Sequence, residues 1–205
     1  MIYSVCTIEV PPARANDALS GLSKAIEAGR LGAGELRACW YSEIGRLNRV
    51  LAVAAYPSAN DLEAANRAML TSDDPFGVAS VATAISLETY AAFPGVDFLQ
   101  PGDVGPIFEV REYALRQGTV APTFAAWQKV LAARTALSPL AIVMYALSGS
   151  VPRFMHIWPF RSLDERMAIR ADSVKRGVWP PPGGLPLLET MRSEIFLPAP
   201  FSPLR

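Results

Sequence analysis

The sequence contains an internal repeat that spans almost its whole length. The segment IYSV that begins at Ile2 recurs as IFEV at Ile107, and Ser58 in YPS matches Ser162 in FRS. The tripeptide LET also occurs once in each half, and all these matches keep their order at a separation of 101 to 105 residues. Ordered matches at a nearly constant separation indicate a duplicated unit. The chain is therefore expected to fold as two similar halves.

A segment rich in proline and glycine separates the two halves. Residues 92–106 read AFPGVDFLQPGDVGP and hold three prolines and three glycines, which interrupt any regular element. We therefore predict a first repeat at residues 1–98, a linker at residues 99–106 and a second repeat at residues 107–205.

Each half is expected to hold four strands and two helices. Alternating apolar residues predict strands, and apolar residues at helical spacing predict helices. The predicted first-half strands are residues 2–9, 35–43, 49–56 and 81–91, and its helices lie within residues 13–29 and from the cap at Ser58 to Leu70. The predicted second-half strands are residues 107–114, 140–147, 154–158 and 186–196; its first helix presents Phe124, Trp127, Val130 and Leu131, and its second runs from the cap at Ser162 to Gly177.

The order of elements in each half, βαββαβ, is that of a ferredoxin-like unit. Such a unit has the sheet order 4-1-3-2 and carries both helices on one face of the sheet. Because the other face must also be covered, we expect the two sheets to pack against each other. The predicted fold class is thus α+β, with tandem ferredoxin-like repeats that form an α/β barrel within one chain.

Composition and cysteine content exclude several classes of protein. Lys+Arg and Asp+Glu both number 19, so no basic surface for DNA or RNA is expected. Neither a signal peptide nor an apolar run long enough for a membrane helix is evident, and we expect a cytoplasmic protein. Cys6 and Cys39 are too few for a zinc site, and we expect no disulfide between them because the third strand lies between their strands. No metal site is predicted.

A candidate site lies on two strands of the second half. On the first strand, Glu109, Arg111 and Tyr113 share one face and form a polar row. On the third strand, His156 and Trp158 share one face. The two strands are expected to be antiparallel neighbours, so His156 should meet the polar row at a cross-strand distance of about 5 Å.

The polar row is expected to point into the barrel. Phe108 and Val110 form the opposite, apolar face of the strand, which suits packing beneath the helices. At the corresponding first-half positions the sequence has the smaller residues Ser4, Cys6 and Ala52, and also Ile8. These would leave room opposite, so a single pocket per chain is expected.

Two interpretations of this group remain open. It could hold an acidic or enolic small molecule, with Arg111 as a bidentate clamp for an anion and His156 as a general base. Alternatively, Glu109 and Arg111 neutralise one another and His156 is a core residue, since buried charges must be paired in any case.

Three further segments have open interpretations. The turn around Gly45 and Asn48 is ordinary turn chemistry or the rim of a cavity guarded by Glu43 and Arg49. Arg166 and Arg170, one helical turn apart, pair with Asp164 or Asp172, cover the end of their helix, or bind an anionic partner. Residues 178–186, VWPPPGGLP, cannot be helical and would form a lid or an interface loop.

Several of these motifs resemble the NIPSNAP family. They are WYSEIGRLNRV at residues 40–50, YPS at residues 56–58, IFEVREYALRQG at residues 107–118 and HIWPFRSLDER at residues 156–166. The resemblance covers nearly the whole chain. It implies the dimeric α/β barrel variant of the ferredoxin-like plan, in agreement with the strand count.

The resemblance implies less about activity. NIPSNAP proteins are described mostly through partners, organelle or vesicle membranes and trafficking, and no agreed set of catalytic residues comes with the family. The wider superfamily includes cofactor-independent monooxygenases and haem-handling enzymes. A haem would need His156 as its axial ligand, and neither a second ligand nor a propionate cluster is evident, so we expect no cofactor.

Two functions are therefore carried forward. The first is the binding of a small molecule or a protein partner, with Glu109, Arg111, Tyr113 and Trp158 as ligand-binding residues. The alternative is a monooxygenase-like enzyme acting on an aromatic or enolic substrate, with His156 as the base. A homodimer is compatible with either.

Overall fold

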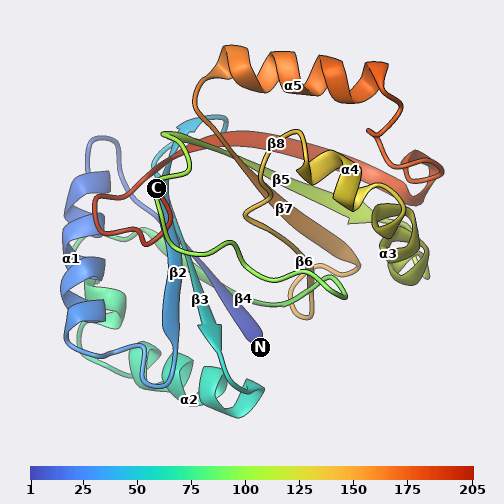
Figure 1. Ribbon diagram of the computed structural model, residues 1–205. Helices are drawn as coiled ribbons and strands as arrows, with labels where there is room; N and C mark the ends of the chain where they lie inside the picture. The colour runs from blue at the N-terminus through green and yellow to red at the C-terminus, as the bar shows by residue number, and fades with distance from the viewer.

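A computed structural model describes all 205 residues. Eight antiparallel strands close into a single barrel in the order β1-β3-β2-β8-β5-β7-β6-β4. Helices lie outside the barrel, with α1 and α2 beside the strands of the first half and α3, α4 and α5 beside those of the second (Figure 1). No helix is long and apolar enough to cross a membrane.

The elements follow the predicted order in both halves. The first half consists of β1 (Ile2–Glu9), α1 (Ala15–Glu27), β2 (Glu35–Ile44), β3 (Arg49–Tyr56), α2 (Ala59–Leu70), the 3-10 turn η1 (Pro75–Gly77) and β4 (Ala84–Ala92). The second half consists of β5 (Ile107–Leu115), α3 (Val120–Gln128), α4 (Leu131–Thr135), β6 (Ile142–Ala146), β7 (Arg153–Phe160), α5 (Leu163–Lys175), the 3-10 turn η2 (Leu185–Leu187) and β8 (Leu188–Pro198). The single helix expected after β5 is thus divided into α3 and α4.

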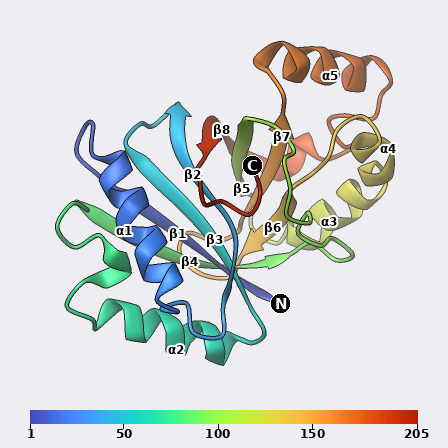
Figure 2. The same cartoon turned by 60° about the vertical axis from the view of Figure 1, so that its left-hand side comes forward.

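The predicted sheet order is confirmed in each half. Strands run β4-β1-β3-β2 in the first half and β8-β5-β7-β6 in the second. The barrel closes where β2 pairs with β8 and where β4 pairs with β6; Figure 2 shows the first of these junctions. Cys6 and Cys39 lie on either side of Ala52 in β3, and both are buried free thiols, as expected.

Serine caps begin the second helix of each half. Ser58 accepts a hydrogen bond from the backbone N–H of Asp61, and Ser162 accepts one from the backbone N–H of Glu165. Glu165 in turn accepts from the backbone N–H of Arg161, the residue before the cap, at 2.5 Å, and so satisfies a second backbone donor at this helix start. Both helix starts therefore lie where the sequence predicts them.

The barrel interior is filled with apolar side chains from both halves. A cluster of 19 buried residues draws on all eight strands and on no helix. Within it, the rings of Trp40 and Phe108 lie 5.0 Å apart across the two halves. The expectation that Phe108 and Val110 pack beneath the helices is therefore wrong. An eight-stranded barrel can be filled by side chains alone, and here apolar rows from both sheets turn inward and fill it.

The turn between β2 and β3 joins the two halves. Gly45 and Asn48 have positive φ angles of 111° and 58°. Arg49, at the start of β3, is buried and forms an ion pair of 2.7 Å with Glu194 of β8. Glu194 also accepts a hydrogen bond from the backbone N–H of Arg46. The turn therefore has a structural role at one end of the barrel.

The C-terminal segment crosses back to the first half. The backbone N–H of Ala199 donates to the carbonyl of Cys39, whose own N–H donates to the hydroxyl of Ser202. Leu204 is fully buried in the barrel cluster. The segment, drawn in red, lies near β2 in Figure 1.

The inward direction of Phe108 can be tested by truncation. Phe108→Ala should lower the free energy of unfolding by about 3 to 5 kcal/mol, because it leaves a cavity in a packed interior. Leu47→Ala, in an exposed turn position, should change it by less than about 0.5 kcal/mol. Urea denaturation measures both, and similar small effects would contradict the filled barrel.

Candidate functional site

The polar row lies on the outer face of the sheet, beneath the helices. Arg111 is directly opposite His156 in the β5–β7 ladder, and Glu109 is opposite Trp158. The predicted cross-strand neighbours are therefore present. Their side chains do not point into the barrel, as the sequence led us to expect, because Phe108 and Val110 occupy that side of β5.

Glu109 is the hub of a buried hydrogen-bond network. Its side chain is 1% exposed, and its Oε1 atom accepts from Arg111 Nη1 at 2.7 Å. The same oxygen accepts from Arg166 Nη2 and from Ser193 Oγ, both at 2.5 Å. Burial opposes ionisation, but the hydrogen bonds from Arg166 and Ser193 and the positive charge of Arg111 lower the pKa of Glu109. The group is therefore a carboxylate at neutral pH.

The two arginines of α5 do not pair with neighbouring aspartates. Arg166 reaches across to Glu109, and Arg170 has no carboxylate partner. The expectation that they pair with Asp164 or Asp172 is therefore wrong. Glu109, itself beneath α5, offers Arg166 a buried partner instead.

His156 is enclosed by aromatic rings. Its side chain has no exposed surface, and the ring centroids of Tyr113 and Trp127 both lie 4.9 Å from its own. Its Nδ1 accepts a hydrogen bond of 2.6 Å from Trp158 Nε1, so the proton of the neutral ring is on Nε2. That Nε2 atom has no partner. Burial, and then the charges of nearby arginines, hold the pKa of His156 well below 6.5.

Positive charge exceeds negative charge in this site. Four guanidinium groups gather there, from Arg111, Arg134, Arg166 and Arg170, and Glu109 is the one carboxylate that acts on them. Arg134 is 3% exposed, stacks 4.1 Å above the ring of Trp158 and donates only to Ser138.

The excess charge is accompanied by unused hydrogen-bond donors. The Nε atoms of Arg134 and Arg166 are buried without a partner, as is His156 Nε2. Burial and the neighbouring Arg170 lower the pKa of Arg134 to about 10. Burial and Arg111 lower the pKa of Arg170. Both groups remain cations at neutral pH, so the site lacks negative charge and acceptor atoms.

A cavity of about 210 Å³ adjoins these groups. Its lining combines two guanidinium groups with mainly aromatic and aliphatic side chains: Arg111, Tyr113, Thr123, Trp127, Phe154, Arg170, Val174, Trp179, Pro180, Pro181, Gly184, Leu185, Leu188 and Met191. Five of these residues belong to the proline-rich segment 178–186. That segment packs Trp179 against Trp127, with ring centroids 4.9 Å apart, and so forms one wall of the cavity.

The predicted residues fall into two layers. Arg111 and Tyr113 line the cavity, and the Nε of Arg111 donates to the Tyr113 hydroxyl. Glu109, His156 and Trp158 are buried and do not line it. They hold the lining residues in place from behind.

Sequence reasoning did not identify three residues of the site. Trp127 and Arg134 come from α3 and α4, which follow one another in the chain, and Trp179 comes from the distant proline-rich segment. The helical stripe containing Trp127 indicated only a buried face. No sequence signal distinguishes Arg134 from a surface arginine.

The first half has no corresponding cavity. Cys6, Ala52 and Leu22 of α1 belong to one packed cluster, so the space expected beside the small residues is filled. A Cβ atom on Gly21 would lie 1.9 Å from the carbonyl oxygen of Gly77. Helix α1 therefore packs closely against the 3-10 turn η1. Burial raises the pKa of the Cys6 thiol to about 12, so this thiol is unreactive.

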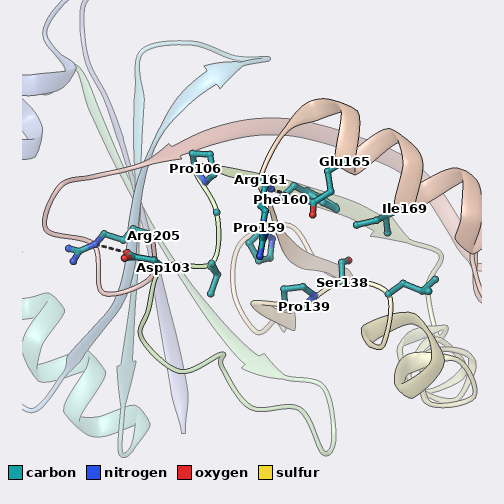
Figure 3. Close-up of a pocket in the computed structure, with 13 residues that line it drawn as sticks. Asp103, Pro106, Ser138, Pro139, Pro159, Phe160, Arg161, Glu165, Ile169 and Arg205 are labelled. Carbon is teal, nitrogen blue, oxygen red and sulfur yellow. Dashed lines mark hydrogen bonds and ion pairs between the residues drawn. The ribbon is translucent and has the colours of Figure 1, made fainter.

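A larger hollow of about 720 Å³ lies between the linker and the N-terminal half of α5 (Figure 3). Its charged lining residues are balanced, with Asp103 and Glu165 against Arg161 and Arg205. Arg205 forms an ion pair of 3.0 Å with Asp103, and none of the lining residues has a buried polar atom without a partner. The hollow therefore lacks the excess of positive charge that marks the smaller cavity, which is lined by Arg111 and Arg170 and by no carboxylate.

Comparisons with known proteins bear on the family and the fold. A family model described as NIPSNAP matches residues 3–87 and 108–203. No curated protein sequence matches the chain. Among solved structures, a NIPSNAP family protein from Agrobacterium tumefaciens is 29% identical, covers 48% of this chain and 98% of its own, and has a TM-score of 0.45.

Two other solved structures align along almost the whole chain. An anthrone oxidase-like protein covers 96% of this chain and 90% of its own, with 12% identity and a TM-score of 0.66. A protein from Lactobacillus acidophilus, provisionally named a monooxygenase, covers 96% of this chain and 92% of its own, with 8% identity and a TM-score of 0.65. These likenesses show a shared fold.

Removal of the Glu109 charge should destabilise the protein. Glu109→Gln leaves four arginines without a carboxylate and should lower the free energy of unfolding at neutral pH by about 3 kcal/mol. The folded-state pKa of Glu109 lies below the unfolded value of about 4.3. Its contribution is therefore present above that pH and is lost as the pH falls through the folded-state pKa.

Urea denaturation of the wild type and Glu109→Gln across this pH range measures the difference, with Glu189→Gln at an exposed position of β8 as the control. A difference that did not shrink at low pH would contradict the assigned charge.

His156 should remain neutral at mildly acidic pH. Nitrogen NMR of this single histidine should show the Nε2–H tautomer and no titration between about pH 8 and about pH 5.5. An ordinary histidine, with a pKa of about 6.5, would gain its second proton within this range. A transition near pH 6.5 would show that the ring is accessible to water and that the buried arrangement is wrong.

Proposed function

The chain belongs to the NIPSNAP family, and we propose that it binds a small organic anion with an aromatic or other apolar body in the cavity beneath α3, α5 and residues 178–186. The observation that carries this proposal is the imbalance of charge around the cavity. Four guanidinium groups act with one carboxylate, Glu109, and the cavity lining includes two of them, Arg111 and Arg170, but no carboxylate.

A carboxylate or enolate ligand would correct this imbalance. Arg111 and Arg170 are the two cations that line the cavity. Arg111 is held by Glu109 and by the Tyr113 hydroxyl, so its position is fixed before a ligand binds. Arg170 has no partner of its own and is the group most available to an anion. Guanidinium groups bind carboxylates with two parallel hydrogen bonds.

The remaining lining favours a flat apolar body. Tyr113, Trp127, Phe154 and Trp179 supply four aromatic rings, and the volume is about 210 Å³. Pockets with an apolar lining and a few convergent polar groups are typical of small-molecule sites. A ring about the size of benzoate therefore suits the cavity in both size and charge.

A second candidate is oxygenation of an enolic or aromatic substrate without a cofactor. The observation in its favour is that excess positive charge lowers the pKa of a bound enol. His156 is poorly suited to the role of base, because its protonation would add a buried cation beside Arg111 and Arg134. In this version the substrate releases its proton to solvent as it binds, and His156 only supports the aromatic wall.

Anion binding can be tested with benzoate as the probe. Tryptophan fluorescence should report binding by the wild type, since Trp127 and Trp179 line the cavity. Arg170→Gln should weaken the affinity about tenfold or more, the usual effect of losing a hydrogen bond to a charged group. The matched control is Arg176→Gln, an exposed arginine of the same segment that pairs with Asp172.

Two results would contradict the proposal: no binding of benzoate by the wild type, or equal loss in both variants. Uptake of dioxygen in the presence of a 1,3-diketone would favour the oxygenase version, and binding without uptake would favour the binding protein. A cytoplasmic location, a protein partner and a homodimer stay predictions.

A further inference from the structure

The cavity has a charged inner end and an apolar mouth. Arg111 has a side chain that is 11% exposed, and Trp127 beside it is 4% exposed. Val174, Leu185 and Met191 also line the cavity, yet they are 59%, 54% and 59% exposed. A single wall thus runs from buried cations to aliphatic side chains in contact with solvent.

The mouth of the cavity, between α5 and β8, exposes apolar side chains to solvent. Val174 belongs to α5, which buries only Ser173 against the rest of the protein. Figure 1 shows α5 along the outer edge of the second half, over β8. Met191 is on β8, opposite Tyr113 in the β5–β8 ladder, so it shares the outer face of the sheet with the polar row. The helix and the strand therefore leave an apolar opening between them.

We propose that the natural ligand is an amphiphilic carboxylate whose apolar chain leaves the cavity between Val174, Leu185 and Met191. Its carboxylate lies against Arg111 and Arg170. This inference rests on the proposed function and names the class of ligand for the same site. It accounts for one feature that a compact ligand leaves unexplained, the three exposed aliphatic side chains at the mouth.

The volume of the cavity supports a ligand that protrudes. About 210 Å³ holds about seven groups the size of a water molecule, at about 30 Å³ each. A benzoate ring with its carboxylate fills that space. Any alkyl chain at the para position must then extend over the residues of the mouth, where it would cover apolar surface that is otherwise exposed to water.

The arrangement of charge favours a free amphiphile over a membrane surface. The cation that would recognise the head group, Arg111, is nearly buried at the inner end of the cavity. A lipid that remained in a bilayer could not place its head group there, because the bilayer surface would stop at the mouth. The head must therefore enter first, and the chain must follow.

The test compares benzoate with para-butylbenzoate and para-octylbenzoate, below their critical micelle concentrations. Each added methylene group should raise the affinity of the wild type by about twofold to fourfold, according to how fully it is buried. Val174→Asp and Met191→Asp should remove most of this gain, which is measured within each variant as the ratio of the affinity for para-octylbenzoate to the affinity for benzoate. Thermal denaturation checks that each variant is folded.

Met167→Asp is the matched control. Met167 is 58% exposed and belongs to α5 but does not line the cavity, so its substitution should preserve the gain with chain length. Benzoate binding that did not strengthen with chain length would overturn this inference and leave the proposed function intact. The absence of any binding would overturn both.

Vesicles supply the remaining comparison. Vesicles of phosphatidylcholine with phosphatidylglycerol should not sediment the protein. If the wild type did sediment with these vesicles and Met167→Asp abolished the sedimentation, the apolar side of α5 would be a membrane surface. That result would overturn the inference.

Discussion

Closure of the barrel determines where every other group of this protein can lie. All eight strands contribute to one apolar interior, which their side chains fill. Once Phe108 and Val110 are turned inward, the alternation of the strand forces Glu109, Arg111 and Tyr113 outward. Polar chemistry is thereby confined to the layer between sheet and helices, where side chains from α3, α4 and α5 can meet it.

The two halves differ in how they fill that layer. In the first half, small residues such as Cys6 and Ala52 let α1 pack directly on the sheet. In the second half, Trp127, Phe154 and Trp179 occupy the layer with large rings. These rings do not fill the layer completely, and a cavity of about 210 Å³ remains beside them. The same backbone plan therefore gives a filled core on one side and a cavity on the other.

Sequence patterns were sufficient for the strands, their order and the pairing of Arg111 with His156, because period-two alternation and the repeat both constrain them. The direction of the polar row was predicted wrongly. The apolar face of β5 was assigned to the helices, whereas it packs inside the barrel against side chains of the other half. The positions of Arg134 and Trp179 were not predictable. They reach the site through tertiary packing of short, irregular segments that carry no periodic signal.

Joining both halves in a single polypeptide has a consequence for how such a site can change. In a symmetric pair of identical chains, each substitution appears on both sides of the barrel, so a residue that opens space on one side also weakens the other. Here the gene specifies the two walls separately. Ala52 can remain small while His156 and its neighbours diversify, so one lobe preserves the scaffold and the other is free to acquire new specificity.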